Sequence, residues 1–318
     1  MRRHDGSHSP ARTLPLILAA LAALLVPMTV GGAAVASDGP ATSWTVQVGA
    51  ESGDQAMQGM AFLPSNVFIN AGDTVNWAAN SAEIHTVTFL APGQSLDSMQ
   101  PFDPSNPLEL FPTPQTSYDG TYTNSGVLTN VSNSGFPSAT TYHLTFPSTG
   151  DFTYYCLVHG MVMTGVVHVR QAGTPYPFTQ AQYDKQAMAQ ERATVRDGNV
   201  LRAATLRLAN QHTVFTGADN GSVMVMRFIR PNVTIHVGDQ ITFTNNGMGA
   251  PHTVTFGAEP PNVFAPSGDP LAFAGGDLNS GIMPPGSTFT VTFTKAGSFT
   301  YICGLHDYMG MVGTVNVR

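Results

Sequence analysis

Charge is scarce in this chain, and positive charge is the scarcer sign. Only 10% of the 318 residues are charged, and 13 lysines and arginines stand against 20 acids, for a net charge of −7. This deficit argues against nucleic acid or an anionic membrane surface as a partner. The chain has instead 32 glycines and 23 prolines, with valine, threonine and phenylalanine in short runs. Such a composition favours an all-β protein with many turns over a helical one.

Cysteine is almost absent, since Cys156 and Cys303 are the only two in the chain. Two cysteines in an exported protein would by default be assigned to one disulfide. An internal repeat argues against that pairing, because it places the two cysteines at equivalent positions of two copies.

The first 36 residues predict a targeting segment. Three arginines precede an apolar run over residues 14–30, and the small-residue cleavage pattern Ala34-Val35-Ala36 follows. We therefore expect a signal peptide over 1–36 and an exported protein, periplasmic or extracellular. The alternative is an uncleaved membrane anchor, because the apolar run from Leu14 to Val35 is just long enough to span a bilayer.

The rest of the chain contains one sequence pattern twice, in the same order. The matching segments are 62–73 (FLPSNVFINAGD) with 228–239 (FIRPNVTIHVGD), 85–89 (HTVTF) with 252–256 (HTVTF), and 150–156 (GDFTYYC) with 297–303 (GSFTYIC). Short alternating strands separated by turn residues recur in both copies. The pattern predicts two β-sandwich domains, over residues 44–170 and 208–318.

Two segments depart from this repeat. The first copy has about twenty extra residues within its Pro/Ser/Asn-rich stretch 91–140, which predicts a long surface loop or hairpin. Between the copies, 171–207 forms a linker, and its Ala/Gln-rich part 180–195 predicts a helix that ends near Asp197-Gly198.

Each copy carries residues with the chemistry of metal ligands. Period-two alternation places Cys156 and Cys303 on the core side of a strand, and an upstream histidine enters the same apolar end. A second histidine follows each cysteine by three residues, and methionines follow on the same loop. A His₂Cys set with a weak thioether axial ligand is the type 1 copper arrangement. Zinc is the weaker interpretation, because methionine rarely occurs in its ligand sets.

The segment Tyr301 to Val315 (YICGLHDYMGMVGTV) resembles the ligand loop of plastocyanins and pseudoazurins, in which the axial methionine lies eight residues after the cysteine. The resemblance extends over nearly all of both copies and implies two Greek-key cupredoxin domains, each with one type 1 copper ion. Its implied ligands are His85, Cys156, His159 and Met163 in the first copy, and His252, Cys303, His306 and Met311 in the second. The first ligand loop is one residue shorter, so Met161 is the alternative to Met163.

One position departs from the family pattern. Relatives often have asparagine directly after the first histidine, where it steadies the ligand loop, whereas Thr86 and Thr253 stand there in this chain. A hydroxyl can serve the same purpose. The other histidines of the repeat region, His143, His168, His212 and His236, are not duplicated, so we expect structural or surface roles for them.

The expected function is electron transfer by copper that cycles between Cu(I) and Cu(II), without catalysis. Two-domain oxidases and nitrite reductases resemble this organisation, but they need further histidines, and no His-x-His pair occurs in the chain. A copper store, carrier or sensor is the other alternative. Apolar residues near His159 and His306 predict docking patches for redox partners, and the net negative charge suggests that these partners are neutral or basic.

Overall fold

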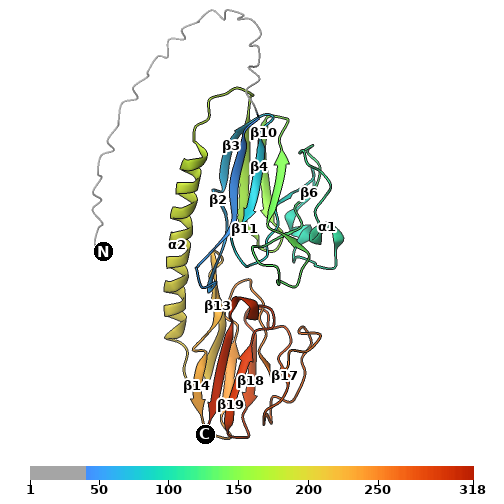
Figure 1. Cartoon of the computed structure of the whole chain (residues 1–318). Helices are drawn as coiled ribbons and strands as arrows, with labels where there is room; N and C mark the ends of the chain where they lie inside the picture. The colour runs from blue at the N-terminus through green and yellow to red at the C-terminus, as the bar shows by residue number, and fades with distance from the viewer. Residues whose placement is uncertain (1–40) are drawn as a thin grey trace, which may run out of the picture. The chain divides into compact units, whose positions relative to one another are not determined.

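Short strands form where apolar and polar residues alternate, and the repeat places them at matching points of both halves. The computed structural model describes residues 41–318, so the predicted targeting segment 1–36 lies outside the described residues. Among the described residues, no helix is apolar over a length sufficient to cross a bilayer. Figure 1 shows the two β-rich halves and the helix that runs beside both of them.

The first half consists of strands with two short helical turns. Its strands are β1 (Ser43–Glu51), β2 (Met57–Leu63), β3 (Asn66–Asn70), β4 (Thr74–Ala79), β5 (Thr88–Phe89), β6 (Thr123–Asn124), β7 (Val127–Leu128), β8 (Ser138–Ala139), β9 (Thr141–Thr145), β10 (Gly150–Cys156) and β11 (Gly160–Arg170). A 3₁₀ turn, η1 (Leu96–Met99), and the helix α1 (Pro107–Leu110) lie between β5 and β6.

The second half repeats this order with fewer elements. Its strands are β12 (Thr213–Asp219), β13 (Val223–Ile229), β14 (Asn232–Ile235), β15 (Gln240–Thr244), β16 (Thr255–Phe256), β17 (Leu278–Asn279), β18 (Thr288–Thr292), β19 (Gly297–Ile302) and β20 (Val312–Val317). A 3₁₀ turn, η2 (Asp307–Met309), precedes the last strand.

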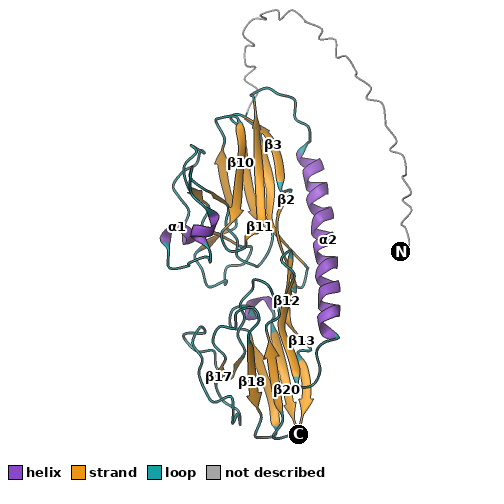
Figure 2. Ribbon diagram, turned by 180° about the vertical axis from the view of Figure 1, so that it is seen from behind, coloured by secondary structure: helices purple, strands orange, loops and turns teal. Residues whose placement is uncertain are grey.

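One sheet is shared by both halves. Its order is β18-β15-β12-β13-β2-β1-β4-β9, and each half completes its sandwich with a separate five-stranded sheet, β3-β11-β10-β5-β6 or β14-β20-β19-β16-β17. The strands β7 and β8 form a small fourth sheet. Figure 2 shows strands packed in layers in both halves, as the predicted all-β sandwich fold requires. That fold class is confirmed.

The two halves join through the antiparallel pair β2 and β13, which occupy equivalent places in the repeat. Gln58 pairs with Met224, its own counterpart, and the pairs on either side are Met57 with Val225 and Gly59 with Val223. The amide of Met60 donates to the carbonyl of Ser222 at 3.0 Å, and the amide of Met226 donates to that of Ala56 at 2.8 Å. The two donors are equivalent in the repeat, and so are the two acceptors. The strand pair therefore has a local pseudo-twofold axis.

The linker helix is longer than the sequence indicates. The helix α2 spans Gln180–Leu206 and begins with a capping box between Thr179 and Gln182. The prediction of an end near Asp197-Gly198 was wrong, because a glycine suits the middle of this helix. A Cβ on Gly198 would lie 2.7 Å from Met57 Sδ and 3.0 Å from Val223 Cγ2. The missing side chain lets the helix approach β2 and β13 where the halves meet.

Each half has its own buried core. Aromatic side chains dominate both, with Trp77, Phe89 and Tyr154 in the first and Phe243, Phe256 and Tyr301 in the second. The first core also contains residues of the second half, namely Met224, Met226, Ala250 and Met309. The apolar contact between the halves therefore continues directly into the first core.

The stretch 91–140 is more than the surface loop that its composition predicts. Leu96 and Met99 of η1 are buried in a cluster with Leu157, which follows Cys156. The side-chain amide of Gln100 donates to the carbonyl of Leu157. The insertion thus packs against the segment that carries the first predicted ligand loop.

Candidate metal centres

The first predicted donor set comes together at one end of the first sandwich. His85 precedes β5 and is held by two backbone hydrogen bonds to Leu128, Cys156 ends β10, and His159 lies in the turn to β11. The Nδ1 atoms of the two histidines are 3.2 Å apart. Cys156 Sγ lies 3.8 Å from His85 Nδ1 and 3.3 Å from His159 Nδ1. Three donor atoms from three segments therefore face one point.

The second half repeats this geometry. His252 and His306 have their Nδ1 atoms 3.2 Å apart. Cys303 Sγ lies 3.7 Å from His252 Nδ1 and 3.4 Å from His306 Nδ1. Both cysteines are free and buried, so the default assignment of a disulfide between them does not hold. Each thiol instead belongs to the histidine pair of its own half.

The spacing and chemistry of both clusters fit one metal ion each. Nitrogen donors at about 2.1 Å and sulfur at about 2.3 Å from one ion, in trigonal or tetrahedral arrangement, lie about 3.4–3.8 Å from one another. The observed separations of 3.2–3.8 Å need little movement to reach that spacing. A thiolate with two imidazoles suits copper in both oxidation states.

Burial sets the protonation of these groups in the metal-free protein. It raises the pKa of both Cys156 and Cys303 to about 11 and lowers the pKa of His306 to about 4. Burial also lowers the pKa of His159 to about 4, against a smaller opposing effect of the Asp219 charge from the second half. The pKa values of His85 and His252 fall well below 6.5, first through burial and then through the neighbouring histidine. The imidazoles are therefore ready to bind metal, whereas each thiol must release a proton.

In each half, one threonine connects the ligand cysteine to the segment of the first histidine. The amide of Thr86 points at Cys156 Sγ at 3.4 Å, and that of Thr253 at Cys303 Sγ at 3.3 Å. Their hydroxyls accept hydrogen bonds from the amides of Leu157 at 2.8 Å and Gly304 at 2.7 Å. A threonine hydroxyl thus ties the ligand loop to the segment of the first histidine.

Methionine burial differs along each ligand loop. Met163 is fully buried in the hydrophobic core of the first half, which contains Cys156. Met311 is fully buried in the hydrophobic core of the second half, which contains Cys303. Met161 is 67% exposed. Met309 is buried, but against the core of the first half. Each half therefore buries one methionine of its ligand loop in its own hydrophobic core, which also contains the ligand cysteine.

Some residues near the clusters carry no signal in the sequence pattern. Ser81 Oγ lies 2.8 Å from His85 Nε2, which leaves Nδ1 of that ring facing the cluster. Glu83 is buried with one carboxylate oxygen unpartnered, and burial raises its pKa to about 7. Neither residue is duplicated, so the repeat that revealed the donors does not identify them.

An acid at the end of the first strand of each half holds the segment before the first histidine. Glu51 Oε2 accepts a hydrogen bond from the amide of Ala82 at 2.9 Å. Asp219 Oδ2 accepts from the amides of Met248 at 3.1 Å and Gly249 at 2.6 Å. Alignment of the preceding Gly-Ala pairs makes Glu51 and Asp219 equivalent, so this signal was available in the repeat.

The remaining histidines of the repeat region stay apart from both clusters. His143 and His236 are exposed, and His212 binds the carbonyl of Gln240. His168 stacks on Phe68 and lies 2.6 Å from Asp151. These contacts are those of surface and structural residues.

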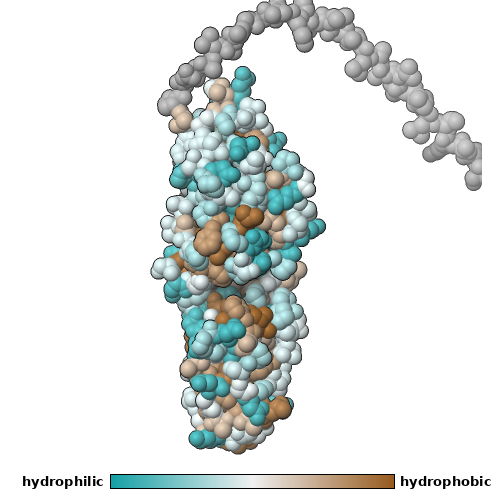
Figure 3. Space-filling view, turned by 90° about the vertical axis from the view of Figure 1, so that its right-hand side faces the viewer, coloured by the Kyte–Doolittle hydropathy of each residue, from teal (hydrophilic) through white to brown (hydrophobic). Residues whose placement is uncertain are grey.

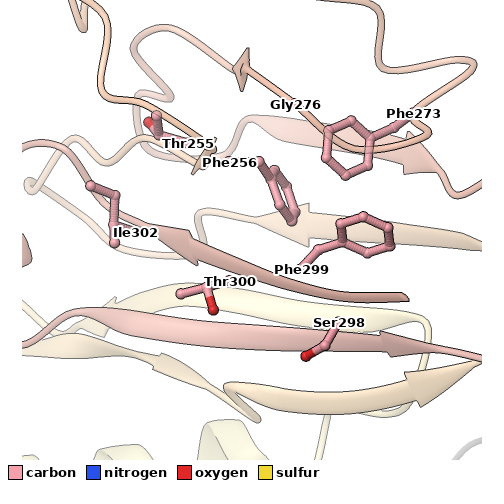
Figure 4. A pocket seen from close by; sticks show the side chains of 9 residues that line it. Thr255, Phe256, Phe273, Gly276, Ser298, Phe299, Thr300 and Ile302 are labelled. Carbon is pink, nitrogen blue, oxygen red and sulfur yellow. The ribbon is translucent and has the colours of Figure 1, made fainter. Parts of the chain in front are cut away.

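A cavity of about 310 Å³ lies elsewhere in the second half. Phe256, Phe273 and Phe299 line it together with Thr255 and Thr300, as Figure 4 shows. None of the predicted ligands contributes to its wall, so the cavity is not part of the metal centre.

The surroundings of the two second histidines differ. Near His159, Met161 and Val162 are exposed, by 67% and 56%. His306 is only 7% exposed, and the nearby Met309 is buried against the first half. Figure 3 shows that apolar residues also reach the surface on one face of the molecule.

Comparison with known proteins matches both halves to one family. A family model described as copper binding proteins, plastocyanin/azurin family, matches residues 46–170 and 212–318. Plastocyanin B'/B'' of Nicotiana tabacum is 36% identical over 107 residues, which are 33% of this chain and 98% of that protein. A chloroplastic plastocyanin of Tetradesmus obliquus is 38% identical over 112 residues, 35% of this chain and 69% of the relative.

Solved structures give matches of the length of one half. The Cu(I) form of an amicyanin mutant is 27% identical, with a TM-score of 0.25, and the match covers 35% of this chain and 85% of the amicyanin chain. A purple cupredoxin from Nitrosopumilus maritimus is 20% identical, with a TM-score of 0.24, over 33% of this chain and 98% of its own.

Proposed function

Since the chain belongs to the plastocyanin/azurin family of copper-binding proteins, with a copper-binding cluster in each half, we propose that it transfers single electrons through two type 1 copper centres. The observation that carries this proposal is the duplicated cluster of one free thiol and two imidazoles, whose donor atoms lie together in each half. Copper bound there supplies a one-electron couple between Cu(I) and Cu(II).

The protein's own contribution to this function is to hold its ligands in place. His85 and His252 are fixed by backbone pairs to Leu128 and Met283. Backbone amides point at both sulfurs, and hydrogen bonds to a thiolate stabilise its charge. Because the protein's own hydrogen bonds hold these groups, a change of oxidation state requires little rearrangement.

We assign Met163 and Met311 as the axial ligands. This assignment is supported by the complete burial of both side chains in the hydrophobic cores that contain Cys156 and Cys303. The other two methionines of the loops differ, because Met161 faces solvent and Met309 packs on the other half. Met163→Leu and Met311→Leu should each change the absorption and reduction potential of one centre, because the axial ligand tunes both. Met161→Leu is the matched control and should leave the first centre unchanged.

The number of ligands favours electron transfer over catalysis. Two imidazoles, a thiolate and a thioether complete the coordination of a type 1 ion, which leaves no position for a substrate. Export to an oxidising compartment accompanies this function in our proposal and is supported by the sequence of residues 1–36. Partners would dock at the apolar residues near His159, where Met161 and Val162 reach the surface.

Metal analysis with visible absorption tests the proposal. The wild type should bind two copper ions with an intense thiolate-to-copper band, and Cys156→Ser and Cys303→Ser should each reduce the count to one. Both centres should cycle reversibly by one electron. Absence of the band, or an unchanged count in both variants, would refute the proposal, and loss of copper on reduction would indicate a carrier of copper instead.

A further inference from the structure

The ligand loop of the second half reaches onto the first half. Between its cysteine and its axial methionine, this loop is one residue longer than the loop of the first half. It forms the turn η2 in this stretch. Met309 in this turn is 2% exposed and belongs to the apolar cluster that contains Cys156. Tyr308 is partly buried against the same cluster. The extra turn thus makes one continuous packing contact from the second ligand loop to the core beside the first centre.

Tyr308 also makes a polar contact with the segment that precedes the first ligand. Its hydroxyl donates to the carbonyl of Ala82 at 3.4 Å. Ala82 is bonded to Ser81, whose hydroxyl lies 2.8 Å from His85 Nε2. In the other direction, Tyr308 is two residues from His306 in the chain. The connection from one ligand to the other therefore consists of covalent bonds and two hydrogen bonds.

The halves are held together in a way that preserves this contact. The pair β2 and β13 forms a continuous sheet across the junction, and α2 packs along strands of both halves. Gly198 lets the helix touch Met57 of one half and Val223 of the other. A hinge at the junction would have to break sheet hydrogen bonds and expose buried methionines, so Tyr308 and Ala82 stay in register.

Only the ligand loop of the second half makes this contact with the other half. In the first half, the shorter loop leaves Met161 and Val162 exposed, and no residue of it takes the place of Tyr308. Ser81 likewise has no counterpart, because Met248 stands at the equivalent position and is exposed. A duplicated pair of sites has thus acquired one connection that neither half alone contains.

From this geometry we propose that Tyr308 is the bridge through which electrons pass between the two metal centres, by way of Ala82 and Ser81 to His85. This rests on the proposed function. The step moves one electron from the reduced centre to the oxidised centre, makes and breaks no bond, and leaves Tyr308 a neutral phenol throughout. The second centre, whose His306 is nearly buried, then exchanges electrons with partners through the first.

Intramolecular redistribution after partial reduction tests the bridge. Met163→Gln serves as a common background, because a changed axial ligand separates the two centres in absorption and potential. A pulse that delivers less than one electron per fully oxidised molecule is followed by absorption at both centres. We expect a redistribution phase whose rate does not depend on protein concentration, and which is absent from a mixture of the two single-centre variants, Cys156→Ser and Cys303→Ser.

The role of Tyr308 is tested in that background by replacement. Tyr308→Leu should slow the phase at least about tenfold, equivalent to about 1.4 kcal/mol in the barrier, and Tyr308→Phe should slow it less because the ring remains. Tyr176→Leu is the matched control, since that tyrosine packs on Trp44 away from both ligand loops, and it should leave the rate unchanged. Equal rates in Met163→Gln with and without Tyr308→Leu would overturn the bridge.

Two further measurements keep the outcomes distinct. Copper count and thiolate bands are recorded first for the wild type and for each variant, so that failure of the wild type to bind copper refutes the proposed function and not the bridge, and rates are compared only between variants that bind two copper ions. Pulsed electron paramagnetic resonance on the oxidised wild type should show dipolar coupling between the two centres. Two intact centres without coupling, or with redistribution that is second order in protein, would refute the inference while the function stands.

Discussion

Gly49 offers a sharp test of how the backbone makes room for the first centre. It has a φ of 79°, and a Cβ placed there would lie 2.6 Å from His85 Nε2 and closer still to the Ser81 hydroxyl. Gly49→Ala therefore introduces two costs, a left-handed backbone with a side chain and a collision with a ligand. Gly72 separates them, because it has a φ of 96° and nothing within 4 Å of its Cβ position.

The two costs can be estimated separately. A non-glycine residue in the left-handed region costs about 1–2 kcal/mol, which applies to both Gly49→Ala and Gly72→Ala. Overpacking adds about 1–3 kcal/mol, and only Gly49→Ala incurs it. We expect the free energy of unfolding to fall by about 2–5 kcal/mol for Gly49→Ala and by about 1–2 kcal/mol for Gly72→Ala.

Urea unfolding with and without copper measures both effects. In a Cys303→Ser background, only the first centre binds copper, and the stabilisation by copper reports the affinity of that centre. This increment should shrink in Gly49→Ala, where His85 is displaced, and remain intact in Gly72→Ala. The reasoning is refuted if both variants lose equal stability and keep the same copper increment.

Three more perturbations follow from the structure. The metal-free protein should lose stability as pH falls from about 6.5 to about 4, because the pKa of His159 and of His306 is about 4 in the folded protein and near 6.5 in the unfolded chain. Each histidine accounts for about 3 kcal/mol of this loss, and Glu83, whose pKa is raised in the folded protein, opposes it. Urea unfolding should show that bound copper protects against the loss. Thr86→Val should cost about 1–3 kcal/mol and weaken copper binding at the first centre, because it leaves the amide of the next ligand-loop residue unpaired, while Thr86→Ser should retain both on titration. Gly198→Leu should lower the free energy of unfolding by about 1–3 kcal/mol, and with it the thermal midpoint, because the new side chain overlaps both halves. Ala203→Leu, on the exposed side of the helix, should change the thermal midpoint little.

Much of the fold follows from local pattern. Alternation such as that in Phe299 to Cys303 predicts a strand with one buried face, and Tyr301 and Cys303 are indeed fully buried. The duplicated order of motifs made the two donor sets recognisable, because two copies of a four-residue constellation do not arise from packing alone. The length of α2 was misjudged for the opposite reason. Gly198 is a helix-ending residue by local propensity, and only its contact with β2 and β13 makes it a good helical residue there.

Composition and periodicity by themselves determined that this chain forms two β-sandwiches, each with a cysteine and two histidines at one buried end. Those properties depend on neighbours in the chain, whose alternation decides which side chains face inward. The tertiary structure alone decided that β2 and β13 join the halves about a pseudo-twofold axis, and that Tyr308 contacts Ala82. Such contacts unite residues more than a hundred positions apart, and no periodicity in a sequence reports which edges and loops will meet in space.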